Sequence, residues 1–350
     1  MKYKLKVLSF FFAVITYSQT IFDVDLEQIA VGSVNGPEAI TFDDNGLMYT
    51  ANEDGRIITL NRDGSNPQNY AQTGGRPLGL KFDSQGNLIV ADAYEGLLSI
   101  NNVGEITVLS TGYDGVPFLL TDDLDIASDG IIYFSDASYL FDLEQTSDDW
   151  GQPNGRLLSY NPSTGETNLL LDSLYFANGV ALSLNDDFLL VNETWRGHTR
   201  RLWLTGLNAG QTEIFTNIYD EIGWVYPDNI TSNGTSIFWC ATLNGPVLGI
   251  DTLGQIKYQL NFDSNLFIQN TSAIQYNDTL YLGTLHDSLV GVIQVPNEIL
   301  VNENSPPEDF SLTFPLVRDT LTASLVNQGD SLVFIDNTHF YWEQSNDPDQ

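Results

Sequence analysis

Six positions recur through the sequence at spacings of about 40 to 56 residues, and four of them carry a carboxylate or amide side chain. Carboxylate and amide oxygens at about 2.3 to 2.6 Å are the ligands that a hard cation such as Ca²⁺ prefers. Carboxylates brought together on one axis repel one another unless a cation lies between them. The pattern therefore predicts one Ca²⁺ site, with other divalent metals as alternatives, built from Glu38, Asp122, Asn178 and Asp228.

A zinc site is less favoured, because none of the three histidines shares this spacing and Cys240 is the only cysteine. A structural interpretation of each residue is also open, since aspartate and asparagine commonly cap turns in β proteins. Their recurrence at one position in four of six repeats favours a shared site. Whether such a metal is catalytic or only ties the repeats together stays open at this point.

The elements that must position these side chains are short strands in a repeating order. Each repeat has a central apolar run, such as Leu47–Tyr49 or Leu88–Val90, preceded by a turn signal such as Asp43–Gly46. Another strand lies on either side, and no amphipathic helix of convincing length interrupts the repeats. We predict an all-β fold, a six-bladed β-propeller with four-stranded antiparallel blades, in which the first strand of each blade lines the central channel.

Ring closure is predicted to use the N-terminal part of the chain. The sixth repeat ends near Val295 without an obvious outermost strand, and the segment 21–30, ahead of the first repeat, alternates like a strand. Pairing the two would close the ring and remove an exposed sheet edge.

Composition restricts the partners of this chain. Asp and Glu number 46 against 13 Lys and Arg, a formal net charge of -33, yet 16 Tyr, 19 Phe and 6 Trp are enough to build a sizeable core. An acidic disordered chain would be poor in aromatics, so we expect a folded protein. Nucleic acid is a poor partner, because phosphate binding needs clustered Lys and Arg, and cations are favoured instead.

The two ends of the chain are predicted to lie outside the propeller, which is assigned to residues 19–296. Residues 1–18 have the basic start, apolar run and small residues of a signal peptide. The apolar run is too short to span a membrane, so we expect a secreted or periplasmic protein without a stable membrane anchor. Residues 297–350 contain further strand-like segments and are predicted to form a β-rich extension of unknown role.

Several motifs, in order, resemble those of the strictosidine synthase-like proteins. These proteins belong to a wider superfamily of calcium-dependent six-bladed propellers that includes gluconolactonases, regucalcin and paraoxonases. The resemblance covers about residues 30 to 295. The motifs that carry it are Gly36–Ile40, Gly75–Leu80, Thr121–Ile126, Phe176–Leu182 and Tyr226–Ile230.

The resemblance implies a catalytic divalent metal held by Glu38, Asp122, Asn178 and Asp228. It also implies hydrolysis of a small-molecule lactone or ester, with the metal polarising the carbonyl and Asp228 acting as both ligand and base. Asn229 is placed by the resemblance next to the oxyanion or the metal. His286, after the second strand of the sixth repeat, is a candidate proton shuttle.

Two departures from the family pattern affect the expected activity. The family usually has Asn where this chain has Asp122, so the site is more anionic and a weaker Lewis acid is expected. In condensing strictosidine synthases the sixth repeat supplies a catalytic Glu, and Ser272 is assigned to that place here. A serine hydroxyl lacks a suitable pKa for that proton transfer, so condensation is disfavoured. The alternative to a hydrolase is a propeller without condensing activity that acts as a metal-stabilised binding protein.

Overall fold

The structure is a computed structural model that describes residues 19–145, 151–263, 265–267, 269–304, 311–315 and 320–324. The predicted signal peptide lies outside the described residues. The chain divides into two compact units, Met1–Leu300 and Val301–Gln350. Within the described residues, no helix is long and apolar enough to cross a membrane.

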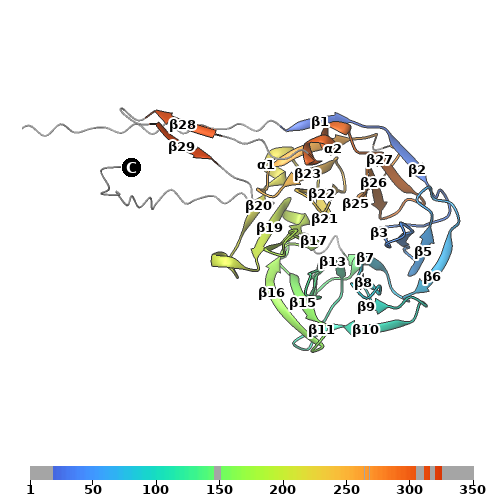
Figure 1. Cartoon of the computed structure of the whole chain (residues 1–350). Coiled ribbons are helices and arrows are strands. Elements are labelled where there is room, and N and C mark those ends of the chain that lie inside the picture. The colour runs from blue at the N-terminus through green and yellow to red at the C-terminus, as the bar shows by residue number, and fades with distance from the viewer. Residues whose placement is uncertain are drawn as a thin grey trace, which may run out of the picture. The chain divides into compact units, whose positions relative to one another are not determined.

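The first unit is a six-bladed β-propeller, as predicted (Figure 1). Blades one to four are each built from four consecutive antiparallel strands. Blade one contains β3 (Ile40–Phe42), β4 (Met48–Ala51), β5 (Arg56–Leu60) and β6 (Gln68–Gln72). Blade two contains β7 (Pro77–Phe82), β8 (Leu88–Asp92), β9 (Gly96–Ile100) and β10 (Ile106–Ser110).

Blades three and four follow the same plan with longer strands. Blade three contains β13 (Thr121–Ile126), β14 (Ile132–Asp136), β15 (Gly155–Asn161) and β16 (Glu166–Leu174), preceded by the short pair β11 (Gly112–Tyr113) and β12 (Val116–Pro117). Blade four contains β17 (Ala177–Leu182), β18 (Phe188–Glu193), β19 (His198–Trp203) and β20 (Thr212–Thr216). Three 3₁₀ turns lie in this half of the ring: Leu143–Gln145, Thr194–Arg196 and Gly206–Asn208.

Blades five and six complete the ring. Blade five contains β21 (Pro227–Ser232), β22 (Ile237–Thr242), β23 (Val247–Asp251) and β24 (Ile256–Asn261), and the helix α1 (Ile218–Ile222) precedes it. Blade six contains β25 (Asn270–Tyr276), β26 (Thr279–Thr284) and β27 (Val290–Gln294), followed by α2 (Asn297–Asn304). In the second unit, β28 (Ser311–Pro315) and β29 (Thr320–Ser324) form an antiparallel hairpin.

The N-terminal segment closes the ring, but it does so as two strands rather than one. β2 (Leu26–Ile29) pairs antiparallel with β27 and becomes the outermost strand of blade six, which confirms the predicted closure. β1 (Thr20–Asp23) pairs parallel with β24 and adds a fifth strand to blade five. The segment 20–29 therefore covers the outer edges of two neighbouring blades (Figure 1).

The hydrophobic core is divided among the blade interfaces. Six clusters of buried apolar side chains each join two adjacent blades. β8 shows why: Leu88 and Val90 pack toward blade one, whereas Ile89 and Ala91 pack toward blade three. A central strand is covered on both faces, so its sequence is a continuous apolar run.

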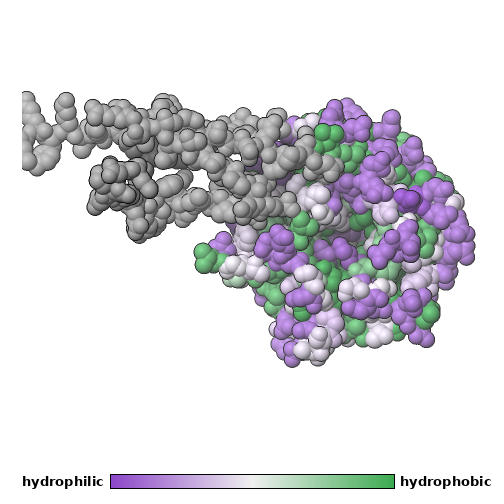
Figure 2. Space-filling view, viewed as in Figure 1, coloured by the Kyte–Doolittle hydropathy of each residue, from purple (hydrophilic) through white to green (hydrophobic). Residues whose placement is uncertain are grey.

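The predicted turn signals form tight hairpin turns at the ends of the inner strands, on the rim opposite to Glu38, Asp122, Asn178 and Asp228. The Asp43 carboxylate accepts the backbone N–H groups of Asn45 and Leu47, and Gly46 adopts a φ of 77°. Asp83 and Gly86 repeat the arrangement in blade two. In Figure 2, hydrophilic residues are interspersed over the visible face of the propeller with hydrophobic residues scattered among them.

Candidate functional site

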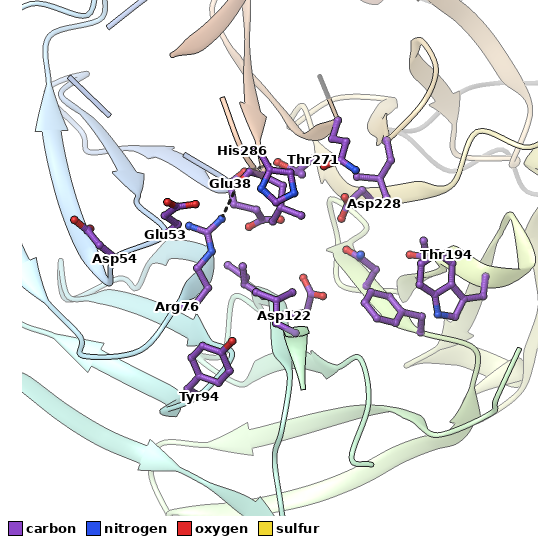
Figure 3. Close-up of a pocket in the computed structure, with 18 residues that line it drawn as sticks. Glu38, Glu53, Asp54, Arg76, Tyr94, Asp122, Thr194, Asp228, Thr271 and His286 are labelled. Carbon is purple, nitrogen blue, oxygen red and sulfur yellow. Dashed lines mark hydrogen bonds between the residues drawn. The ribbon is translucent and has the colours of Figure 1, made fainter. Parts of the chain in front are cut away.

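A cavity of about 580 Å³ opens where the inner strands of the blades begin. Glu38, Asp122, Asn178 and Asp228, from blades one, three, four and five, all line it. Each is almost fully buried, with 2 to 4% of its surface exposed. Figure 3 shows the carboxylates of Glu38, Asp122 and Asp228 turned toward one another at the centre of the ring.

A β-bulge near the start of the inner strand places the site residues of blades three, four and five, whereas Glu38 lies just ahead of the regular strand β3. In β13, Thr121 pairs with Asp136 and the next pair is Leu124 with Phe134, so Asp122 falls inside the irregularity. The same register shift follows Ala177 in β17 and Pro227 in β21. A bulge re-aims the side chain that it contains, and here it turns one residue per strand toward the channel mouth.

The sixth-blade assignment of Ser272 is wrong by one residue. In β25 the register shift lies between Asn270 and Ser272, so Thr271 takes the position that corresponds to Asp122. Thr271 lines the cavity, whereas the Ser272 hydroxyl donates to the backbone oxygen of Glu38 at 2.8 Å. The position of the turn in the sequence does not reveal how many residues the bulge contains. Thr271, like serine, has no carboxylate to offer.

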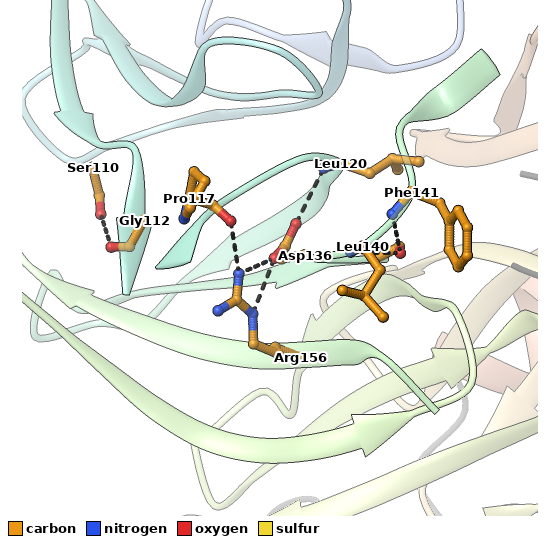
Figure 4. Close-up of polar contacts among 9 residues, drawn as sticks. Ser110, Gly112, Pro117, Leu120, Asp136, Leu140, Phe141 and Arg156 are labelled. Atoms are coloured by element: carbon orange, nitrogen blue, oxygen red, sulfur yellow. Dashed lines mark hydrogen bonds and ion pairs between the residues drawn. The ribbon is translucent and has the colours of Figure 1, made fainter. Parts of the chain in front are cut away.

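Acidic side chains at the ends of the second strands hold the segments that enter the inner strands. Asp136, at the end of β14, accepts the Leu120 N–H at 3.2 Å and also receives the guanidinium of Arg156 (Figure 4). Asp92 accepts the N–H of Arg76 at 2.9 Å in blade two, and Glu193 accepts that of Tyr175 at 3.1 Å in blade four. Burial raises the pKa of Asp136 to about 6, although Arg156 opposes the shift.

A left-handed backbone residue lies two positions before the site residue in four of the blades. Gly36 serves blade one, but Phe176, Tyr226 and Gln269 serve blades four, five and six, with φ of 61°, 50° and 55°. Positive φ in a bulky aromatic residue is strained and persists only where the surrounding structure enforces it. Phe176 and Tyr226, the two aromatic residues with positive φ in the described part of the chain, both lie at the approach to the cavity.

The four residues fit a hard cation. One carboxylate oxygen from each of Glu38, Asp122 and Asp228 lies within 4.8 Å of the others. The Oε2 of Glu38, the Oδ1 of Asn178 and the Oδ1 of Asn229 are buried and accept no hydrogen bond. Buried oxygens without a partner are rare in native proteins, and a ring of them is the donor set of an oxygen-preferring ion.

The electrostatics of the cluster agree with this fit. Burial and the neighbouring carboxylates Asp122 and Asp228 raise the pKa of Glu38 well above its ordinary range. Burial, Asp228 and Asp123 do the same for the pKa of Asp122. The pKa of Asp228 is raised by burial, and a hydrogen bond with the Asn178 side chain opposes the shift. A divalent cation among the three carboxylates would offset both the cost of burying their charges and the repulsion between them.

The two other predicted residues lie at different depths. The Asn229 amide donates to Glu38 Oε1 at 3.2 Å, but its side chain lines a smaller cavity of about 100 Å³ deeper in the channel rather than the main one. His286 lines the main cavity at its exposed mouth, and its backbone N–H faces the Thr284 hydroxyl at 3.4 Å. The His198 side chain instead contacts Glu193 at 3.0 Å and is not part of the cavity lining.

The cavity walls differ in character, and most of their residues were not predicted. On the blade-four side, the ring centroids of Phe176 and Trp195 lie 4.8 Å apart with the rings tilted by 50°, and Leu243 also lines the cavity. Glu53 and Arg76 lie on the opposite wall (Figure 3). Arg76 stands in the Gly75–Leu80 motif, two residues before the blade-two register position, which is the signal that could have identified it.

Comparison with known proteins supports the resemblance. The family model "Strictosidine synthase" matches residues 122–207, and "Strictosidine synthase-like, N-terminal" matches residues 24–60. Strictosidine synthase-like protein 6 of Arabidopsis thaliana is 42% identical over 244 residues, which cover 67% of this chain and 63% of that protein. In sequence, the chain is thus similar to the strictosidine synthase-like proteins.

Other relatives of this chain extend beyond plants. The adipocyte plasma membrane-associated protein of Rattus norvegicus is 34% identical over 238 residues, 61% of each chain. The chain thus spans a little under two thirds of the length of these relatives.

Solved structures share the fold of this chain. A gluconolactonase from Xanthomonas campestris superposes with a TM-score of 0.64 at 17% identity, covering 77% of this chain and 89% of that one. The calcium-binding protein regucalcin from Agrobacterium tumefaciens gives 0.63 at 15% identity, covering 80% and 98%. At such identities the likeness concerns the fold.

Proposed function

We propose that this chain is a calcium-dependent hydrolase of a small-molecule lactone or ester. The observation that carries the proposal is the buried cluster of Glu38, Asp122 and Asp228, with unpartnered oxygens around it, at the floor of an open cavity. A purely structural ion would not need a cavity of about 580 Å³ above it. A substrate has room to reach the cluster here.

Calcium is the favoured ion because every donor in the cluster is an oxygen. Carboxylate and amide oxygens in flexible numbers suit Ca²⁺, whereas zinc sites use histidine nitrogen and cysteine sulfur. The regucalcin that shares the fold is described as a calcium-binding protein, and another neighbour is a gluconolactonase. These neighbours support the choice of ion and of reaction class.

The side chains of the proposed metal centre would have different roles in the reaction. Glu38, Asp122, Asn178 and Asp228 would hold the ion, which when bound polarises a carbonyl group and stabilises negative charge on its oxygen. Asp228 would accept a proton from the attacking water, while the water oxygen forms a bond to the carbonyl carbon. Asp228 would then return this proton to the leaving alkoxide as the bond between the alkoxide and the carbonyl carbon breaks. His286, at the exposed mouth, would exchange protons with solvent.

A condensing activity is not favoured by the sixth blade. Thr271 stands at its register position, and among the described residues of β25 and its approach Gln269 is the other one that lines the cavity. Neither side chain titrates near neutral pH, so neither supplies a general acid or base of suitable pKa. We therefore propose hydrolysis rather than condensation.

Export of the chain remains a proposal that rests on residues 1–18. Expression with the native N-terminus and mass measurement of the mature protein would test it. Recovery outside the cytoplasm with the first 18 residues removed is expected, and an intact N-terminus retained in the cytoplasm would contradict it.

The test of the function is a panel of lactones and aryl esters assayed on the metal-free protein with and without Ca²⁺. We expect turnover of at least one class that is lost with chelator and restored by Ca²⁺. A large rise in melting temperature with Ca²⁺, but no turnover of any member, would favour the alternative of a metal-stabilised binding propeller. Absence of any bound divalent ion and of any response to Ca²⁺ would contradict both.

A further inference from the structure

Arg76 places a buried guanidinium in the wall of the cavity, where only 3% of the residue is exposed. Its Nη1 donates to the backbone oxygen of Gly36 at 2.9 Å and its Nη2 to that of Leu285 at 3.3 Å. These partners belong to blades one and six, whereas Arg76 itself precedes the inner strand of blade two. Its side chain is therefore held at one place beside the carboxylate cluster (Figure 3).

The guanidinium has no direct ion pair with any described carboxylate. Four of the other described arginines each pair with a carboxylate. The two remaining ones, Arg62 and Arg196, lie over tyrosine rings. A buried charge is costly unless an opposite charge compensates it. For Arg76 the strongest attraction comes from Glu38, which is in the cluster.

Arg76 changes the net formal charge of the carboxylate centre. Glu38, Asp122 and Asp228 together carry three negative charges when ionised, and Arg76 reduces the total to two. A divalent cation then makes the centre neutral. Without Arg76 the three carboxylates would match a trivalent cation instead. Asp122 supplies the third carboxylate, so Arg76 and Asp122 offset each other.

We propose that Arg76 is the permanent counter-charge of the three-carboxylate centre and sets its preference for a divalent over a trivalent ion. The inference rests on the metal site of the proposed function but requires no hydrolytic activity. In this role Arg76 is a positioning residue that acts through the electrostatic field at the ion. The competing interpretation is that its hydrogen bonds only fasten blades one, two and six together.

Ion affinities separate the two roles. Trp195 lines the same cavity, so Tb³⁺ in the centre can be detected by tryptophan-sensitised emission, and Ca²⁺ affinity follows from competition. In Arg76→Gln we expect Ca²⁺ to bind about tenfold more tightly and Tb³⁺ to gain more, because the repulsion removed scales with the charge of the ion. Arg76→Lys keeps the charge and should leave the ratio of Tb³⁺ to Ca²⁺ affinity within about threefold of the wild-type ratio.

Two further variants complete the design. Arg56→Gln removes an exposed guanidinium that pairs with Asp54 on the cavity rim, and screening by solvent should keep its affinities close to those of wild type. Asp122→Asn in the Arg76→Gln background restores a net charge of minus two, so the ratio of affinities should return toward the wild-type value.

The outcomes distinguish failure of this inference from failure of the proposed function. A folded Arg76→Gln protein whose affinity ratio is unchanged, or whose affinities both fall equally, would overturn the counter-charge role. If Arg76→Gln does not fold, Arg76→Lys decides, because an altered ratio in that variant contradicts a role through charge. A wild-type protein that binds neither ion would instead refute the metal site itself.

Discussion

Asp122 and Asp123 are neighbours in β13 and are both buried, yet they face different surroundings. Asp122 turns into the main cavity, where Glu38 and Asp228 meet it. Asp123 turns into the deeper channel, where its Oδ2 accepts the Val180 N–H of blade four at 2.8 Å. Asp125, two residues on, likewise accepts the Leu182 N–H and pairs with Lys81 at 2.9 Å.

The difference separates carboxylates that stabilise the fold from carboxylates that are proposed to bind a cation. Asp123 and Asp125 accept hydrogen bonds from backbone N–H groups of β17, the inner strand of blade four. On its channel side, β17 has no neighbouring strand in its own sheet to accept these hydrogen bonds. Glu38, Asp122 and Asp228 instead lie close together against their mutual repulsion, which Arg76 offsets only in part. Burial of a carboxylate therefore does not by itself identify a candidate metal site in this protein. The hydrogen bonds that each carboxylate accepts make the distinction.

The largest expected effect is on catalysis, from Asp228→Asn. Losing both a ligand charge and the proposed base should lower kcat/KM on a responsive lactone or ester by about 10³-fold or more. The protein should stay folded, because the substituted amide is nearly isosteric. Asp123→Asn is the matched control and should retain kcat/KM within about tenfold. Equal losses in the two variants would abolish the distinction between the two groups of carboxylates.

The next effect is on stability, from Asp136→Ala in the network that positions the approach to Asp122. Removing this carboxylate leaves Arg156 buried without its partner and should lower the free energy of unfolding by about 3 kcal/mol. Urea denaturation measures it. Asp54→Ala, which breaks the exposed pair with Arg56, should cost no more than about 1 kcal/mol. A similar loss in both would show that burial of the pair is unimportant.

Opposite effects on stability are expected from Asp122→Asn and Asp123→Asn in the metal-free protein. Asp123→Asn weakens a buried hydrogen bond and should lower the free energy of unfolding by about 2 kcal/mol, with little change in Ca²⁺ affinity. Asp122→Asn relieves repulsion, so it should raise the stability of the metal-free protein while lowering Ca²⁺ affinity about tenfold. Calorimetric titration and denaturation in chelator test both. Loss of stability in Asp122→Asn would contradict the difference drawn between Asp122 and Asp123.

The smallest effect is a dependence on pH. The raised pKa values of Glu38, Asp122 and Asp228 mean that the metal-free fold favours their protonated forms. Their contribution to the stability of the metal-free protein is therefore full below their ordinary pKa values and is lost as pH rises through the raised ones. Ca²⁺ must displace these protons, so its affinity should rise with pH by up to about tenfold per unit for each proton released.

Melting temperatures with Ca²⁺ and with chelator, measured from acidic to neutral pH, would show this trend. The difference between the two should widen as pH rises. A constant difference would mean that the three carboxylates are already ionised in the metal-free protein. Asp122→Asn, with one carboxylate fewer, should show a shallower trend than wild type.

Much of the architecture follows from local patterns in the sequence. Apolar runs such as Leu88–Val90 form the central strands, since both faces of a blade are covered, and the Asp43–Gly46 type of turn depends only on nearby backbone groups. The division of the N-terminal segment into β1 and β2 was not predicted. The two strands add to different blades, and that choice depends on edges formed by residues more than 200 positions away.

The candidate site shows the same division. The sequence by itself determined that Glu38, Asp122, Asn178 and Asp228 recur at one register position, because a similar distance from the turn signal of each repeat implies an equivalent place in the ring. Only the tertiary structure decided that Thr271 rather than Ser272 completes this position, and that Asp122 rather than Asp123 faces the cavity. It also brought Arg76 beside Glu38. A bulge changes which way a side chain points without changing the spacing of the repeats, and electrostatic balance depends on distances that only the closed ring defines.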